Sequence, residues 1–160
     1  MQPNRPPSTT ASLRRTAIPG GRVVNLRSEM DSEDVQVLLS LALGNPSPTR
    51  MEEVTQIYRF LPEYYFCGYR MGGDVVGCLG LQLLTAKEGA VRHLVVLPAH
   101  RRKGIARAMV GHTLRRFQLE RLMAECDADA VDFFRRCGAA VEPVAGGRFR
   151  CSWAVEKETI

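Results

Sequence analysis

The sequence of 160 residues lacks the patterns that mark several common classes of protein. Its five cysteines form no CxxC pair and match no zinc-ligand spacing, so we expect reduced thiols and no metal site. Its unbroken apolar stretches, such as residues 94–97, are far shorter than the roughly 20 residues that span a bilayer. We therefore expect a cytoplasmic protein that does not associate with membranes.

Acidic residues are missing from the first 28 positions, although arginine occurs there repeatedly. The net charge of +5 resides in this segment, because residues 29–160 carry equal numbers of basic and acidic side chains. Residues 1–21 are rich in proline, serine and glycine and lack apolar periodicity, which predicts a flexible basic tail. Residues 22–160 suffice for a single domain. Since the excess charge lies in the tail, we expect no nucleic-acid partner.

The hydrophobic pattern predicts the element order β-α-α-β-β-β-α-β-α-β. Strands are expected at residues 22–26, 64–70, 75–84, 90–97, 122–126 and 149–155. Helices are expected at residues 31–43, 49–61, 104–121 and 127–137, with Asp31 or Ser32 and Thr49 as caps of the first two. Gly77 and Gly80 within a strand indicate a bulge or a close backbone approach. The central hairpins favour an α/β fold with a mixed (α+β) sheet flanked by helices.

The most informative stretch is residues 91–110, VRHLVVLPAHRRKGIARAMV. A strand ends at a proline, a basic loop follows, and Gly104 opens a helix. The first turn of a helix offers unpaired N–H groups and a partial positive charge, and a glycine lets a diphosphate approach the backbone closely. This pattern predicts an anion site, although a basic helix that only faces solvent has the same composition. The stretch contains neither GxGxxG nor GxxxxGKS/T, which excludes a Rossmann turn and a P-loop.

Residues 101–106, RRKGIA, match the (Q/R)xxGx(G/A) signature of the GNAT superfamily of acyl-CoA-dependent N-acyltransferases. Residues 94–98 resemble the fourth strand of that family, and the element order over residues 22–155 is similar as well. The resemblance implies that residues 22–160 form one acetyl-CoA-binding N-acetyltransferase domain, in which the fourth and fifth strands splay apart around the thioester.

The resemblance also implies which residues hold acetyl-CoA. Backbone groups of Val95 and Leu97, on either side of Val96, would bind the pantetheine arm. The pyrophosphate would be held by a run of backbone amides with added positive charge, from Arg101, Arg102, Lys103, Gly104, Ile105, Ala106 and Arg107.

A second family pattern, NxxAxxxYxxxGF, is matched only in part. Asp127, Ala130 and Gly138 occupy three of its positions, but Phe134 stands where the family has a tyrosine and Ala139 replaces the final phenylalanine. That tyrosine often protonates the departing CoA thiolate, which Phe134 cannot do. The match therefore implies a cofactor-binding role for Asp127 and Phe134, and either another acid or weak activity.

The expected reaction is direct attack of a primary amine on the thioester in a ternary complex, for which a general base is expected. His93 has a suitable intrinsic pKa and Glu88 lies near it in sequence, whereas residues 90–92 offer no carboxylate. A lone strand histidine can equally be a hydrogen-bonded structural residue. The acceptor would be a small-molecule or peptide amine, and a homodimer is common among the proteins that this chain resembles.

Two other interpretations of the sequence stay open. A catalytically weak acyl-CoA-binding regulatory module would share the fold and would account for Phe134. A nucleic-acid-binding protein would use the tail and the 101–107 loop, but no aromatic residues are interleaved with those basic residues.

Overall fold

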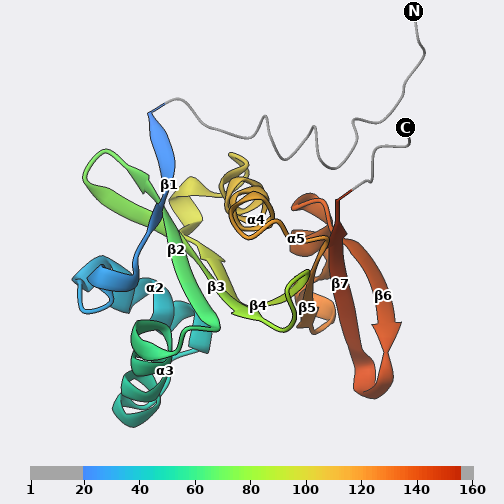
Figure 1. The fold of residues 1–160 in the computed structure, drawn as a ribbon, viewed down its shortest axis with the longest axis horizontal. Coiled ribbons are helices and arrows are strands. Elements are labelled where there is room, and N and C mark those ends of the chain that lie inside the picture. Colours follow the sequence, from blue (N-terminus) through green and yellow to red (C-terminus); the bar gives the residue numbers. More distant parts are fainter. Residues whose placement is uncertain (1–19, 156–160) are drawn as a thin grey trace, which may run out of the picture.

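The computed structural model describes residues 20–155 and shows one seven-stranded sheet with helices on both faces (Figure 1). The strand order is β1-β2-β3-β4-β5-β7-β6, and every neighbouring pair is antiparallel except β4–β5. The strands are β1 (Gly21–Asn25), β2 (Tyr64–Met71), β3 (Asp74–Leu83), β4 (Glu88–Val96), β5 (Arg121–Cys126), β6 (Ala140–Val144) and β7 (Arg148–Ala154). The predicted mixed sheet is confirmed. Residues 1–19 of the predicted tail lie outside the described residues.

Two helices cover each face of the sheet. The helices are α2 (Glu33–Leu43), α3 (Pro48–Phe60), α4 (Ile105–Arg116) and α5 (Val131–Arg136), with short 3₁₀ turns η1 (Arg27–Glu29), η2 (Pro98–His100), η3 (Ala128–Ala130) and η4 (Ala145–Gly147). Figure 1 shows α2 and α3 together on one side of the sheet and α4 and α5 on the other. Two separate apolar clusters result, one under each pair of helices. Among residues 20–155, no helix is long and apolar enough to cross a bilayer.

Local signals set the ends of the helices. Ser32 caps α2 as predicted, and Gly44 ends it at a φ of 70°. For α3 the predicted cap Thr49 is wrong, because the Ser47 side chain accepts the Arg50 N–H and Pro48 occupies the first turn. Helix α4 stops at Arg116, short of the predicted residue 121, because Gln118 adopts a φ of 50° that a helix cannot continue.

Strand β6 is absent from the predicted element order. It pairs only with β7 and forms an edge of the sheet, where a proline is tolerated because one side of the strand has no neighbour to receive an N–H. The proline and the exposed Glu142 hide the apolar alternation that would identify a strand.

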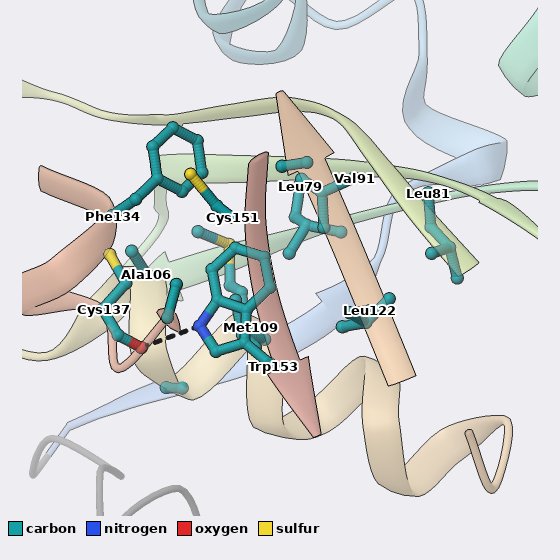
Figure 2. Close-up of a cluster of buried hydrophobic side chains, with 14 of the residues drawn as sticks. Leu79, Leu81, Val91, Ala106, Met109, Leu122, Phe134, Cys137, Cys151 and Trp153 are labelled. Carbon is teal, nitrogen blue, oxygen red and sulfur yellow. Dashed lines mark hydrogen bonds between the residues drawn. The ribbon is translucent and has the colours of Figure 1, made fainter. Parts of the chain in front are cut away.

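The larger cluster joins α4, α5 and the C-terminal strands around Trp153 (Figure 2). Trp153 is 1% exposed, and its indole Nε1–H donates to the Cys137 backbone oxygen at 3.1 Å. The ring of Phe134 lies 5.9 Å from that of Trp153, so α5 is held to β7 by both an apolar contact and a hydrogen bond. Trp153 is thus a central residue of this apolar cluster.

Replacing Trp153 with phenylalanine should lower the free energy of unfolding by about 1–3 kcal/mol, because it leaves a cavity and an unpaired buried carbonyl at Cys137. Chemical denaturation measures the change. Val37→Ala on α2, where the side chain is 48% exposed, is the control and should change stability by less than about 0.5 kcal/mol. Equal stability of the Trp153 variant and the wild type would contradict this packing.

Candidate active site

Strands β4 and β5 separate after a short parallel pairing. Only residues 88–90 of β4 pair with β5, through Arg121, Leu122 and Met123. All of β5 pairs with β7 on its other side, and no strand among the described residues pairs with the second edge of β4 from Val91 to Val96. This confirms the predicted splay of the fourth and fifth strands. An open strand edge in the middle of a sheet presents main-chain donors and acceptors to whatever enters the gap.

A bulge in β4 decides which residues face the gap. Gly80 pairs with His93 and Leu81 with Val91, so Arg92 is the extra residue. Beyond the bulge, Leu97 N–H donates to Val76 O at 2.9 Å and Leu97 O accepts from His100 N–H at 2.9 Å. Both backbone groups of Leu97, which the resemblance assigns to the pantetheine arm, thus already have a partner within the chain.

Because main-chain groups alternate along a strand, the groups that face the gap belong to the residues next to Val95 and Leu97. Since Leu97 N–H points to β3, the N–H of Val95 does so too, and the backbone groups of Leu94 and Val96 point into the gap. The Val96 carbonyl confirms this direction, because it accepts the Arg101 Nε–H at 3.0 Å. The sequence could not reveal this register, because the bulge shifts the phase of the alternation.

The loop between β4 and α4 presents backbone N–H groups at the open end of the gap. Arg102 and Gly104 have φ values of 64° and 81°, both in the left-handed region, and Gly104 is the N-cap of α4. The first hydrogen bond of the helix runs from Ala108 N–H to Gly104 O at 2.9 Å. The N–H groups of residues 105–107 therefore point out of the helix end, where the helix dipole adds positive potential.

A cavity of about 230 Å³ lies at this helix end. It is lined by Val96, His100, Arg101, Arg102, Gly104, Ile105, Ala106, Arg107, Phe133, Arg136 and Cys137. No aspartate or glutamate is among the described residues that line it, so the lining combines apolar walls with the side chains of four arginines. That combination suits a diphosphate joined to an apolar arm. The predicted Lys103 is exposed and is not among the lining residues.

Four lining residues are absent from the predicted set: His100, Phe133, Arg136 and Cys137. His100 Nδ1 is buried and has no hydrogen-bond partner within residues 20–155. The other three come from α5 and its C-terminal end, which is fixed against α4 by a bond from Arg107 Nη2 to Arg136 O at 3.1 Å. The partial match around Asp127 and Phe134 could have found them, because it covers the helix that carries them.

The two predicted residues of that partial match lie outside the cavity lining. Phe134 is 8% exposed and packs in the core beside Cys151 and Trp153 (Figure 2). Asp127 is exposed and precedes η3, where its backbone oxygen accepts from Ala130 N–H at 3.2 Å. Its neighbour Phe133, and not Phe134, contributes an aromatic ring to the cavity.

His93 stands at the bulge, on the strand edge that is open to the gap, and is half-buried. Its Nδ1 lies 2.5 Å from the hydroxyl of Tyr58 on α3. Burial lowers the pKa of His93 to about 4, with the charges of Arg50 and Arg92 acting in the same direction, so the ring is neutral at pH 7. Burial also raises the pKa of Tyr58 far above its usual range, so the phenol keeps its proton.

Glu88, the other predicted base, is not brought together with His93. It begins β4 and faces Arg121 in the parallel pairing, at the closed end of the gap. Five residues of extended chain, roughly 15 Å, separate it from His93. The sequence suggested both residues, and the structure places only His93 beside the open edge.

Comparison with known proteins agrees with this geometry. The sequence profile of the acetyltransferase (GNAT) family matches residues 32–139. The chain therefore belongs to the GNAT acetyltransferase family, which places the protein among the acyltransferases. No sequence among the curated proteins matches it.

Solved acetyltransferase structures share the fold at low sequence identity. An acetyltransferase from Thermus thermophilus is 15% identical, with a TM-score of 0.68 over 84% of this chain and 97% of that one. Ard1 from Thermoplasma volcanium is 16% identical, with a TM-score of 0.66 over 86% and 99%. The N-acetyltransferase PseH from Campylobacter jejuni, in complex with acetyl coenzyme A, is 10% identical, with a TM-score of 0.65 over 85% and 99%.

The lowered pKa of His93 makes stability depend on pH. Between pH 6.5 and 4 the unfolded chain binds a proton at His93 that the folded chain does not, so the free energy of unfolding falls as the pH falls through this range. We expect the loss from His93 to reach up to about 3 kcal/mol. Denaturation at several pH values should show a shallower slope for His93→Gln than for the wild type. Identical slopes would mean that His93 titrates normally in the fold.

Proposed function

We propose that this protein transfers an acetyl group from acetyl-CoA to a primary amine by direct attack in a ternary complex. The observation that carries the proposal is the alignment of three features: the open edge of β4, the free N-terminus of α4 and the acid-free cavity between them. Val96 lies on the open edge of β4 and also lines the cavity, so the hydrogen-bonding strand edge adjoins the arginine-lined helix end.

Each part of acetyl-CoA has a counterpart along this surface. The backbone groups of Leu94 and the N–H of Val96 would hold the amides of the pantetheine arm in the manner of an added strand, since the Val96 carbonyl already accepts from Arg101. The N–H groups of residues 105–107 and the arginines around them would hold the pyrophosphate. Gly104 keeps the approach open, since its φ of 81° disfavours any side chain there.

Acetyl-CoA would supply the acetyl group as a thioester, with its carbonyl at the bulge near His93. The amine nitrogen forms a bond to the carbonyl carbon, the carbon–sulfur bond breaks with its electron pair on sulfur, and one proton leaves the nitrogen. Holding both substrates in this geometry removes much of the entropic barrier. His93 is the side chain that we place at the reacting group, and Glu88 would act only if the acceptor reaches the closed end of the gap.

The acceptor is a small-molecule or peptide amine that enters from the side of α2 and α3. We place the protein in the cytoplasm, since all five of its cysteines are free thiols and are buried. A second candidate function is an acyl-CoA-binding regulatory module that binds without turnover. Phe134 favours it, because phenylalanine has no hydroxyl to protonate the thiolate and this residue is packed in the core.

Calorimetric titration tests the binding half of the proposal. Acetyl-CoA should bind with a Kd on the order of micromolar, CoA should bind similarly, and ATP should bind much more weakly because it cannot use the edge of β4. Release of CoA thiol in the presence of lysine, spermidine or a short peptide then tests transfer. Binding without transfer to any amine would support the regulatory module. Failure to bind acetyl-CoA would overturn both, and salt-dependent binding of a DNA duplex would then favour the nucleic-acid interpretation.

Gly104→Glu should weaken acetyl-CoA binding more than about 100-fold, because it places a side chain and a negative charge in the anion site. Gly44→Glu is the matched control: Gly44 also has a positive φ, 70°, and a Cβ there would have open space. Both variants should lose roughly 1 kcal/mol of stability from backbone strain. Equal affinity of the two variants for acetyl-CoA in calorimetry would place the anion site elsewhere.

A further inference from the structure

Tyr58 reaches His93 through a space that depends on Gly80. The Tyr58 side chain is 1% exposed and its ring contacts those of Tyr64, Phe66 and His93, with centroids 5.7, 4.8 and 5.5 Å away. Gly80 is the cross-strand partner of His93, and a Cβ at Gly80 would collide with the Tyr58 hydroxyl and with its ring. The bulge places His93 opposite Gly80, and the space at Gly80 lets the buried Tyr58 hydroxyl reach the Nδ1 atom of His93.

The available donors and acceptors determine the direction of the hydrogen bond between Tyr58 and His93. Within residues 20–155, Nδ1 of His93 is the one partner of the Tyr58 hydroxyl. If Nδ1 carried the proton and donated it, the buried O–H of Tyr58 would have no acceptor, which costs about 1–3 kcal/mol. If the O–H donates to Nδ1, both groups are satisfied and the ring proton lies on Nε2. The second arrangement is therefore the stable one.

The Nε2 atom is left for a ligand. Within the described chain it has no hydrogen-bond partner, and it is not among the buried atoms that lack one. It belongs to a residue on the open stretch of β4, beside the Leu94 main chain that faces the gap. An Nε2–H on a neutral ring at this place is a hydrogen-bond donor.

We propose that Tyr58 is a positioning residue that holds His93 as the Nε2–H tautomer, so that His93 donates a hydrogen bond to the negative charge that develops on the thioester. This inference rests on the proposed acetyl transfer and replaces the predicted role of His93 as a base. His93 keeps its proton throughout, and the proton that the amine loses goes to water while the thiolate takes one from water. No proton is therefore gained or lost by the side chain.

The surroundings of His93 agree with a neutral donor. Arg50 and Arg92 are the charged groups that act on it, and both disfavour a second proton on the ring. Tyr58 is buried, so its phenol stays protonated and remains a donor. A base would need the opposite arrangement, in which the partner of Nδ1 is an acceptor such as a carboxylate.

Nitrogen NMR of the histidine rings tests the tautomer on the free wild-type protein, with His93→Gln identifying the His93 signals. We expect His93 to show the Nε2–H form alone, and Tyr58→Phe, which keeps the ring packing, to introduce the Nδ1–H form. An Nδ1–H form of His93 in the wild type would overturn the inference. This measurement needs no acetyl-CoA, so its failure differs from failure of the proposed function, which calorimetry and thiol release report.

Kinetics of CoA release test the role of the tautomer. His93→Gln keeps an N–H donor near the Nε2 position and should retain kcat within about 10-fold, whereas His93→Ala should lose about 100-fold, as for other oxyanion donors. Tyr58→Phe should lower kcat and leave the KM for acetyl-CoA unchanged. Equal losses for His93→Gln and His93→Ala would support a base and overturn the donor role. If the wild type transfers no acetyl group, the proposed function fails, and NMR still decides the tautomer.

Discussion

Beyond Ala90, strand β4 pairs with β3 on one side and with no strand of the described chain on the other. This half-paired stretch constrains the rest of the structure. A strand has two polar edges, and β5 covers only residues 88–90 of one of them. The main-chain groups of Leu94 and Val96 that face the gap lie in the middle of a sheet, between helices on both faces, where an unpaired carbonyl or N–H is costly. One of these groups has a partner within the chain, because the Arg101 side chain donates a hydrogen bond to the Val96 carbonyl. The remaining groups, the end of α4 and the ring of His93 are all arranged around that same unpaired edge.

The fold could be predicted from the sequence where one local signal acts on one element. The Ser32 cap of α2 and the strand expected at residues 149–155 both agree with what the structure shows. The errors occur where that condition fails. Strand β6 contains a proline that is tolerated only because the strand lies at the edge, and α4 ends early because Gln118 takes a left-handed conformation. The bulge at Arg92 reverses the alternation that follows it in β4, so the sequence pattern alone does not show which main-chain groups of this strand face the gap.

The candidate site divides in the same way. Residues 101–106 form a contiguous signature, so a candidate anion site at the start of α4 could be proposed without any tertiary information. His93 could be singled out as a titratable residue on a strand, but not its partner, because Tyr58 lies 35 residues earlier in the chain. The aromatic residues that follow Tyr58 in the sequence predict that it belongs to the core, and its side chain is indeed buried. Only the packing of α3 over Gly80 shows that the hydroxyl of this core side chain reaches a polar atom at the gap.

The open edge of β4 consists of main-chain atoms, and every amino acid except proline carries the same ones. Half-buried or exposed side chains of β4 can therefore change without altering these hydrogen-bonding groups, provided that the strand and its bulge persist, whereas Val91 and Val96 are held by packing in the core. Positions such as Gly80 and Gly104 have no such freedom, since the space and the backbone angle there admit few residues. Mutational tolerance is thus spread unevenly along the site. This accounts for a chain that is only 10–16% identical to solved acetyltransferases and still keeps their architecture.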